Sequence, residues 1–149
     1  MPALQDVDAL HAAAAARLRE ADQMYTTGRR ELVELLAALA RPVTIYELLD
    51  AKPKLTQSSV YRNLAVLEEM GVVQRVQGND DRARFELADH LIGHHHHLVC
   101  TTCGRVDDFV APAEAESMLD AVLVAAVEGT GFRAAGHRLD VLGVCADCA

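Results

Sequence analysis

The chain has 149 residues, of which 51% are hydrophobic and 24% are charged, and its formal net charge is -8. This composition is typical of a globular protein with one core or two small ones. No apolar stretch reaches the roughly 20 residues that a membrane span requires, and the first ten residues carry acids where a signal peptide carries bases. We therefore expect a cytoplasmic protein without a membrane segment.

Charge is distributed unevenly along the chain. Up to Ala88 there are 11 basic and 13 acidic residues, and from Asp89 onwards there are 3 and 9. The negative net charge argues against non-specific coating of nucleic acid. The asymmetry suits two domains, one that meets an anion through a local basic face and one whose carboxylates help to hold cations.

The first half of the chain predicts a series of helices. Hydrophobic spacing and turn residues place them at about residues 8–22, 29–40, 44–49 and 57–70. Thr44 followed by Glu47 is a capping-box pattern, which opens the third helix. Thr56 is the expected N-cap of the fourth helix, and Gly71 is the expected C-terminal residue in a left-handed conformation.

A two-stranded hairpin is predicted to follow these helices. Residues 72–76 and 82–87 flank a turn-like GNDD segment, and the hairpin carries Arg75, Arg82 and Arg84. Short helices followed by a hairpin form the winged version of helix-turn-helix, in which the last helix enters the major groove and the wing touches phosphate. A generic helical subdomain is the alternative.

The fourth helix has two different faces. Val60 and Leu64 fall on an apolar face, whereas Ser58, Tyr61 and Arg62 fall on the opposite side. An exposed aromatic ring beside a guanidinium offers apolar contact to thymine methyl groups and bidentate contact to guanine or phosphate. This pair favours DNA binding.

The pattern changes after Ala88. A polar connector precedes four histidines, and the remainder predicts strands at 98–99, 106–110 and 132–144 with a helix at 113–128 that ends at Gly129. The whole chain is thus expected to be α+β, with a winged helix-turn-helix unit followed by a small α/β unit.

All four cysteines lie in this second part, as two Cys-x-x-Cys pairs: Cys100 with Cys103, and Cys145 with Cys148. In a cytosolic chain thiols stay reduced, so a disulfide framework is the weaker interpretation. Two such pairs supply the four soft ligands that tetrahedral zinc takes. We therefore predict a structural zinc ion that ties the beginning of the second unit to its end.

The run His94 to His97 is internal, so it is not a terminal purification tag. In an extended segment successive side chains point to opposite faces, which gives two pairs of imidazoles and two possible metal sites. A solvated polar strand is the alternative. A catalytic metal would also use histidines, but neither a His-Glu-x-x-His helix nor a nucleophile elbow occurs, and we expect no enzyme activity.

Three motifs together resemble the ferric uptake regulator family of bacterial metal-dependent repressors. They are SVYR at 59–62 with Leu64, HHHHLVCTTCG at 94–104, and GVCADC at 143–148. The resemblance covers about residues 20–149. It implies a homodimer with an operator-binding winged helix at 1–88, a hinge at about 88–93 and an α/β dimerisation domain at 94–149.

The resemblance also implies roles for individual residues. The DNA-contacting set would comprise Arg29, Ser58, Tyr61 and Arg62. The cysteines match the family's structural zinc site. A regulatory site at the hinge would use Glu86, His95 and His97, and a second site would use His94, His96, His137 and a glutamate of the following helix.

Some positions depart from the family pattern. Pro42 stands where iron-type members often have a histidine, and Gln74 and Ala88 replace ligands of zinc-type members. The connector is about two residues longer than usual and contains His90, which we expect to supply the missing hinge ligand. The aligned helix position is Ala115, so either Glu114 or Glu116 is the ligand, and we assign Glu116.

These features predict a metal-responsive repressor that controls metal uptake or homeostasis genes. A divalent ion at the hinge (zinc, iron, manganese or nickel) would fix the angle between the two winged helices of a dimer. An iron-dependent peroxide sensor of the same family is one alternative, because iron held by histidines can oxidise its own ligands. A metal buffer or carrier without DNA binding is the other.

Overall fold

The computed structural model describes residues 6–149. Four helices begin this part of the chain: α1 (Val7–Glu20), α2 (Thr27–Leu39), α3 (Ile45–Ala51) and α4 (Gln57–Glu69). They agree with the four predicted helices to within about two residues. None of the helices in the described residues is long and apolar enough to cross a bilayer.

The ends of these helices are formed by the predicted local contacts. The Thr44 side chain accepts a hydrogen bond from the Glu47 backbone while the Glu47 side chain accepts one from the Thr44 backbone, which confirms the capping box. Thr56 caps α4 by accepting from the Ser59 backbone. Gly71 follows α4 with φ +69°, the left-handed conformation that a residue without Cβ adopts at little cost.

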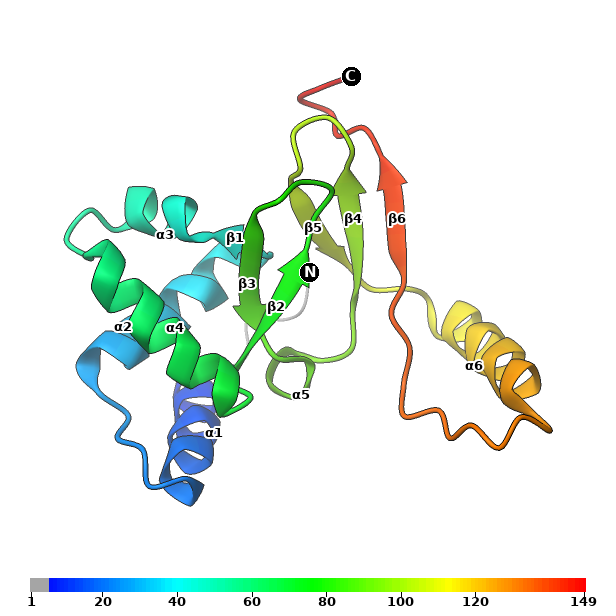
Figure 1. Ribbon diagram of the computed structural model, residues 1–149, viewed down its shortest axis with the longest axis horizontal. Coiled ribbons are helices and arrows are strands. Elements are labelled where there is room, and N and C mark those ends of the chain that lie inside the picture. The colour runs from blue at the N-terminus through cyan, green and yellow to red at the C-terminus, as the bar shows by residue number, and fades with distance from the viewer. Residues whose placement is uncertain (1–5) are drawn as a thin grey trace.

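The first sheet completes the winged helix. Its strands are β1 (Val43–Thr44), β2 (Val73–Gln77) and β3 (Ala83–Leu87), and both neighbouring pairs are antiparallel, with β3 in the centre. Phe85 and Leu87 of β3 pack into the main core with Leu64 and Leu67 of α4 and with leucines of α1 and α2. Figure 1 shows the four helices gathered on one side of this sheet.

The second sheet lies on the other side of the β2–β3 hairpin (Figure 1). Its central strand β4 (His96–Cys100) pairs antiparallel with β5 (Val106–Phe109) and parallel with β6 (Asp140–Gly143). The short helix α5 (Asp89–Ile92) occupies the connector, and α6 (Ala113–Val127) joins β5 to the segment before β6.

The predicted strand over 132–144 is wrong for its first eight residues. Pairing with β4 begins at Asp140, opposite His97. The preceding segment is irregular, and Phe132 is 68% exposed. A strand forms only where the chain reaches a partner with free backbone groups, and alternation in the sequence does not show where that contact begins.

Helix α6 is apolar yet has no buried residue. Met118, Val122 and Val124 are each more than 60% exposed, and Leu142 of β6 is 64% exposed. In Figure 1 α6 stands away from the body of the molecule. Apolar surface of this extent marks an association face, as the predicted homodimer requires.

Candidate metal centres and DNA-binding face

The four cysteines come together as predicted. Cys100 ends β4 and Cys103 follows it, while Cys145 and Cys148 follow β6. Their Sγ atoms lie within 4.8 Å of one another, and all four are free thiols. The Cys103 and Cys145 sulfurs are 3.8 Å apart, which matches the edge of about 3.8 Å in a tetrahedron with Zn–S bonds of about 2.3 Å.

The local backbone favours thiolate at Cys100. Hydrogen bonds from the backbone of Cys103 and Cys145 lower the pKa of the Cys100 thiol to about 6. The neighbouring thiols of the cluster raise the pKa of Cys148 to about 12, so a cation is required to hold all four as the thiolates that bind zinc. The cluster therefore fits a structural zinc ion in its ligand type and its geometry.

A second cluster, here called the hinge cluster, comprises Glu86, His95, His97 and Asp108. Glu86 Oε2 lies 3.1 Å from His95 Nε2, and Glu86 Oε1 lies 3.0 Å from His97 Nε2. Asp108 offers its two carboxylate oxygens at 3.8 Å from the same two nitrogens. One ligand atom from each of the four residues thus faces a common point between β3, β4 and β5.

The surroundings of the hinge cluster orient its imidazoles. His95 Nδ1 is 3.0 Å from the Gly93 carbonyl oxygen, and His97 Nδ1 is 3.3 Å from the Asp140 carboxylate. Both partners accept a hydrogen bond from Nδ1–H and leave Nε2 as the ligand atom, which is the usual arrangement around protein-bound metals. The Gln74 side-chain amide donates to Glu86 at 2.7 Å.

The charges of the hinge cluster are arranged around Glu86. Burial by itself raises the pKa of Glu86, but hydrogen bonds from His95, His97 and Gln74 outweigh it and bring that pKa to about 2. Burial lowers the pKa of His95, while Glu86 and the Gly93 carbonyl raise it to about 9. Burial and the charge of Glu86 raise the pKa of Asp108 to about 7. In the metal-free protein a proton on the imidazoles therefore compensates the buried carboxylates.

The fourth member of the hinge cluster is Asp108 and not His90. His90 is exposed on α5, where partial desolvation and the positive charge of the neighbouring Arg17 lower its pKa. Asp108 Oδ1 is buried without a hydrogen-bond partner, and a cation held by the four residues would satisfy it. The sequence contained a signal for this residue, because alternation along β5 places Asp108 on the same face as the buried Val106.

A third cluster, the histidine cluster, comprises His94, His96, Glu116 and His137. His96 Nε2 is 2.6 Å from Glu116 Oε1, and His94 Nε2 is 3.2 Å from His137 Nε2. The alternation predicted for the histidine run is thus confirmed, because its odd and even members enter different clusters. Of the candidate glutamates, Glu116 is the one that reaches the imidazoles.

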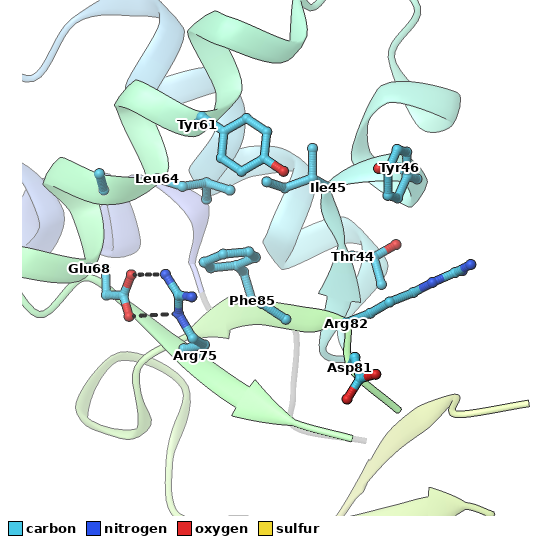
Figure 2. Close-up of a pocket in the computed structure, with 12 residues that line it drawn as sticks. Thr44, Ile45, Tyr46, Tyr61, Leu64, Glu68, Arg75, Asp81, Arg82 and Phe85 are labelled. Atoms are coloured by element: carbon cyan, nitrogen blue, oxygen red, sulfur yellow. Dashed lines mark hydrogen bonds and ion pairs between the residues drawn. The ribbon is translucent and has the colours of Figure 1, made fainter. Parts of the chain in front are cut away.

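The predicted DNA-binding residues of α4 lie on an open face. Ser58, Tyr61 and Arg62 are exposed, and Tyr61 is 50% exposed despite its size. Figure 2 shows Tyr61 and Tyr46 above β3, beside a cavity of about 430 Å³ between α3, α4 and the hairpin. This face has the shape and side chains that a base-reading helix needs.

Arg29 has a different role from the predicted DNA contact. Its guanidinium donates to the Met24 carbonyl oxygen and to the Gln23 side chain, in the connection between α1 and α2. The structure therefore uses Arg29 to hold this connection in place and does not support its assignment to DNA.

The three arginines of the hairpin also differ from one another. Arg75 binds Glu68 through two hydrogen bonds and stacks on Phe85 (Figure 2). Arg84 is buried against Asp80. Arg82 is exposed and extends away from the hairpin, so it is the best placed of the three to touch phosphate.

Comparison with known proteins agrees with these sites. Residues 20–142 match the family described as the ferric uptake regulator family. The chain is 35% identical over 135 residues to the peroxide operon regulator of Bacillus subtilis strain 168, and this match covers 88% of each protein. The chain belongs to the ferric uptake regulator family. It is a DNA-binding transcription regulator and not an enzyme, as the sequence predicted.

Solved structures of ferric uptake regulators share the fold. The Helicobacter pylori ferric uptake regulator has a TM-score of 0.75 at 21% identity, covering 99% of this chain and 97% of that one. The Pseudomonas aeruginosa ferric uptake regulator solved with manganese has a TM-score of 0.63 at 29% identity, covering 88% and 96%. The winged helix and the second α/β unit are both included in these matches.

The charges of the hinge cluster predict how metal binding depends on pH. With a His95 pKa of about 9, a proton must leave this ring before Nε2 can bind a metal ion. We expect metal affinity to rise with pH, by about tenfold per unit for each proton released, until the pH reaches that pKa. Titration of the zinc-loaded protein with Mn²⁺ at several pH values from slightly acidic to mildly alkaline measures this slope. The His137→Ala variant, which weakens the histidine cluster, isolates the signal, and a flat profile would contradict the assignment.

Proposed function

We propose that the hinge cluster is the regulatory metal site of a repressor that controls metal uptake or homeostasis genes. The observation that carries this proposal is the origin of the four ligands. Glu86 belongs to the hairpin of the winged helix, whereas His97 and Asp108 belong to the second sheet and His95 directly precedes its strand β4. An ion bound by all four joins the DNA-binding unit to the unit that carries the apolar α6.

In this proposal the metal sets the angle between the winged helix and the second unit. Without an ion, Glu86 is held by protonated imidazoles, which can separate when their charge changes. A divalent ion replaces these hydrogen bonds with coordination bonds and fixes the winged helix at one angle. In a homodimer that covers the α6 and β6 surfaces, this angle sets the spacing of two Tyr61–Arg62 faces on operator DNA. DNA must then raise metal affinity by the same factor as metal raises DNA affinity.

The cysteine cluster has a separate role. Four thiolates leave no open position on zinc, so this site is structural and does not respond to the sensed metal. It fixes β4 to the chain after β6 in every state of the protein. Reduced thiols and a DNA target both support a cytoplasmic location.

The donor set of the hinge cluster admits several ions. Two imidazole nitrogens and two carboxylates suit iron, manganese, nickel or zinc, and relative affinity does not select among them in a cell. The Pseudomonas aeruginosa relative was solved with manganese. The histidine cluster, with three imidazoles and Glu116, offers a second position for such an ion.

A peroxide-sensing repressor is the second candidate. Relatives that share 29–35% identity with this chain are named peroxide regulators. The hinge cluster is compatible with this function because Fe²⁺ bound by His95 and His97 can reduce peroxide beside the rings it is bound to. Oxygen added to an imidazole removes a ligand and would release the winged helix.

The roles of Asp108 and His90 can be separated by one pair of variants. We expect Asp108→Ala to raise the Mn²⁺ concentration needed for operator binding by about 10- to 100-fold, because a hinge ligand is lost. His90→Ala is the matched control and should behave as wild type. Fluorescence anisotropy with a duplex selected by the wild-type protein gives both values. If His90→Ala weakened operator binding and Asp108→Ala behaved as wild type, His90 would be the ligand and Asp108 would not.

The DNA-binding face is tested by Tyr61→Ala and Arg62→Ala. Each should weaken operator binding by about 1–3 kcal/mol and leave zinc content and Mn²⁺ affinity unchanged, because both side chains are remote from the three clusters. Glu69→Ala, an exposed substitution on the same helix, is the control. If both variants bind the operator like wild type, a metal carrier becomes the better interpretation.

Peroxide sensing is tested by loading the hinge with either Fe²⁺ or Mn²⁺ before adding hydrogen peroxide. For a sensor we expect the Fe²⁺ form to lose operator binding and to gain one oxygen atom on His95 or His97, as peptide mass spectrometry would show. The Mn²⁺ form should remain bound and unmodified. Equal resistance of both forms would leave metal sensing as the function.

A further inference from the structure

The tip of the β2–β3 hairpin contacts the zinc-binding loop of the second unit. The wing tip is residues 78–84, and the zinc knuckle is Cys100–Gly104. At their junction lies Arg84, whose side chain is 5% exposed. Its two terminal nitrogens donate to the two carboxylate oxygens of Asp80 at 2.6 and 2.9 Å, and one of them also donates to the Arg82 carbonyl oxygen at 3.2 Å. Such a fork is the strongest geometry for this kind of ion pair.

The zinc knuckle touches this ion pair directly. A Cβ on Gly104 would lie 2.4 Å from Asp80 Oδ2 and 2.9 Å from Arg84 Nη2. A Cβ on Gly78 would lie 2.4 Å from Arg84 Nη1 and 3.2 Å from the Gly104 carbonyl oxygen. Gly104 also has φ +76°, so it is required both for space and for its backbone conformation. The side chains of Asp80 and Arg84 therefore pack closely against the backbone of Gly104.

A small apolar core supports the same junction. Val76 of β2, Val99 of β4 and Val106 of β5 form a buried cluster that is separate from the main core of the winged helix. These three side chains bury apolar surface between the hairpin and the second sheet. The Arg84 side of the ion pair is therefore buried at the edge of a packed contact, whereas the Asp80 side chain is 30% exposed.

The charges at this junction attract Arg84 toward the zinc knuckle. A zinc ion with four thiolates carries a formal charge of about -2, and Gly104 follows the ligand Cys103 in the chain. The buried Arg84 guanidinium places positive charge beside this anionic centre, and Asp80 pairs with the same guanidinium from the wing side. Arg84 is thus bound on one side by the wing and attracted on the other by the zinc knuckle.

The position of Arg84 on β3 links this junction to the hinge cluster. Phe85 and Leu87 face the helices, whereas Arg84 and Glu86 are two residues apart and share the face toward the second sheet. Both are buried. One strand face therefore meets the second unit at two points, one beside the structural zinc site and one at the hinge cluster.

We propose that Arg84 is a positioning residue that fastens the wing to the zinc knuckle and so gives the winged helix a pivot that does not depend on the regulatory metal. This proposal rests on structural zinc at the four cysteines. The tip of the hairpin is then held at the zinc knuckle in every state of the protein. A hinge metal adds a second contact, at Glu86, between the same hairpin and the second sheet. Arg84 is not a phosphate contact, because its guanidinium is used inside the protein.

The test compares Arg84→Met with Arg84→Lys and with the exposed control Arg82→Met. Each full-length protein is zinc-loaded and carries no hinge metal or DNA, so the outcome does not depend on the proposed function. Hydrogen exchange of the wing tip and of the zinc knuckle reports the docking, and transfer of zinc to a chelator reports the charge effect. Zinc content by atomic emission is measured first.

We expect Arg84→Met to speed exchange in both segments by about tenfold or more and to speed zinc release, with Arg82→Met unchanged in both. Arg84→Lys should lose the fork but keep the charge. It should therefore resemble Arg84→Met in exchange and wild type in zinc release, a split that a general loss of stability would not give. Asp80→Asn should speed exchange in the same two segments, and it serves as the variant if Arg84→Met does not fold.

Three results would overturn the proposal. One is exchange and zinc release in Arg84→Met that match those of Arg82→Met. Another is unchanged exchange of both segments in Arg84→Met with faster zinc release alone, which would leave a charge effect on zinc without docking of the wing. The third is a zinc content far below one ion per chain in the wild-type protein, which would remove the structural zinc site itself and leave the hinge assignment untouched.

Discussion

Burial of strand β3 on both faces is the constraint on which the rest of the structure depends. One face adds Phe85 and Leu87 to the core of the winged helix, and this face holds α4 in place. The other face carries Arg84 and Glu86, which are charged and yet are 4% and 2% exposed. Buried charges are stable only with partners, so this face requires Asp80, the imidazoles or a metal ion. The strand thereby couples DNA reading to metal binding.

Buried ionisable groups make the hinge cluster responsive. Glu86, Asp108 and the two imidazoles lie close together where water is largely excluded, so a proton or a metal ion must compensate the carboxylates. A protonated pair of histidines satisfies Glu86 but leaves one Asp108 oxygen without a partner. A divalent cation satisfies all four residues together. The cysteine cluster does not have these two alternatives, because four thiolates complete the coordination of a single zinc ion.

Local patterns predicted the features that depend on neighbours in the chain. The capping box at Thr44, the N-cap at Thr56 and the alternation of the histidine run were all confirmed, because each depends on residues a few positions apart. The family was recognisable for the same reason, since its motifs are short and dense. Predictions that required contacts between distant segments were less reliable. His90 lies exposed on α5, Arg29 is bound in the connection between α1 and α2, and the first eight residues of the last predicted strand are irregular.

The sequence by itself therefore determined the first four helices and the hairpin that follows them, the four cysteines of the zinc site and the split of the histidines between two faces, whereas it missed the short elements β1 and α5. Only the tertiary structure decided that Asp108 completes the hinge cluster, that Glu116 and not Glu114 meets His96, and that Arg84 faces the zinc knuckle. The physical reason is that a ligand set or a buried ion pair is a property of a point in space. Sequence spacing alone allows several residues of the right type to reach such a point. The packing of the two sheets then selects among them.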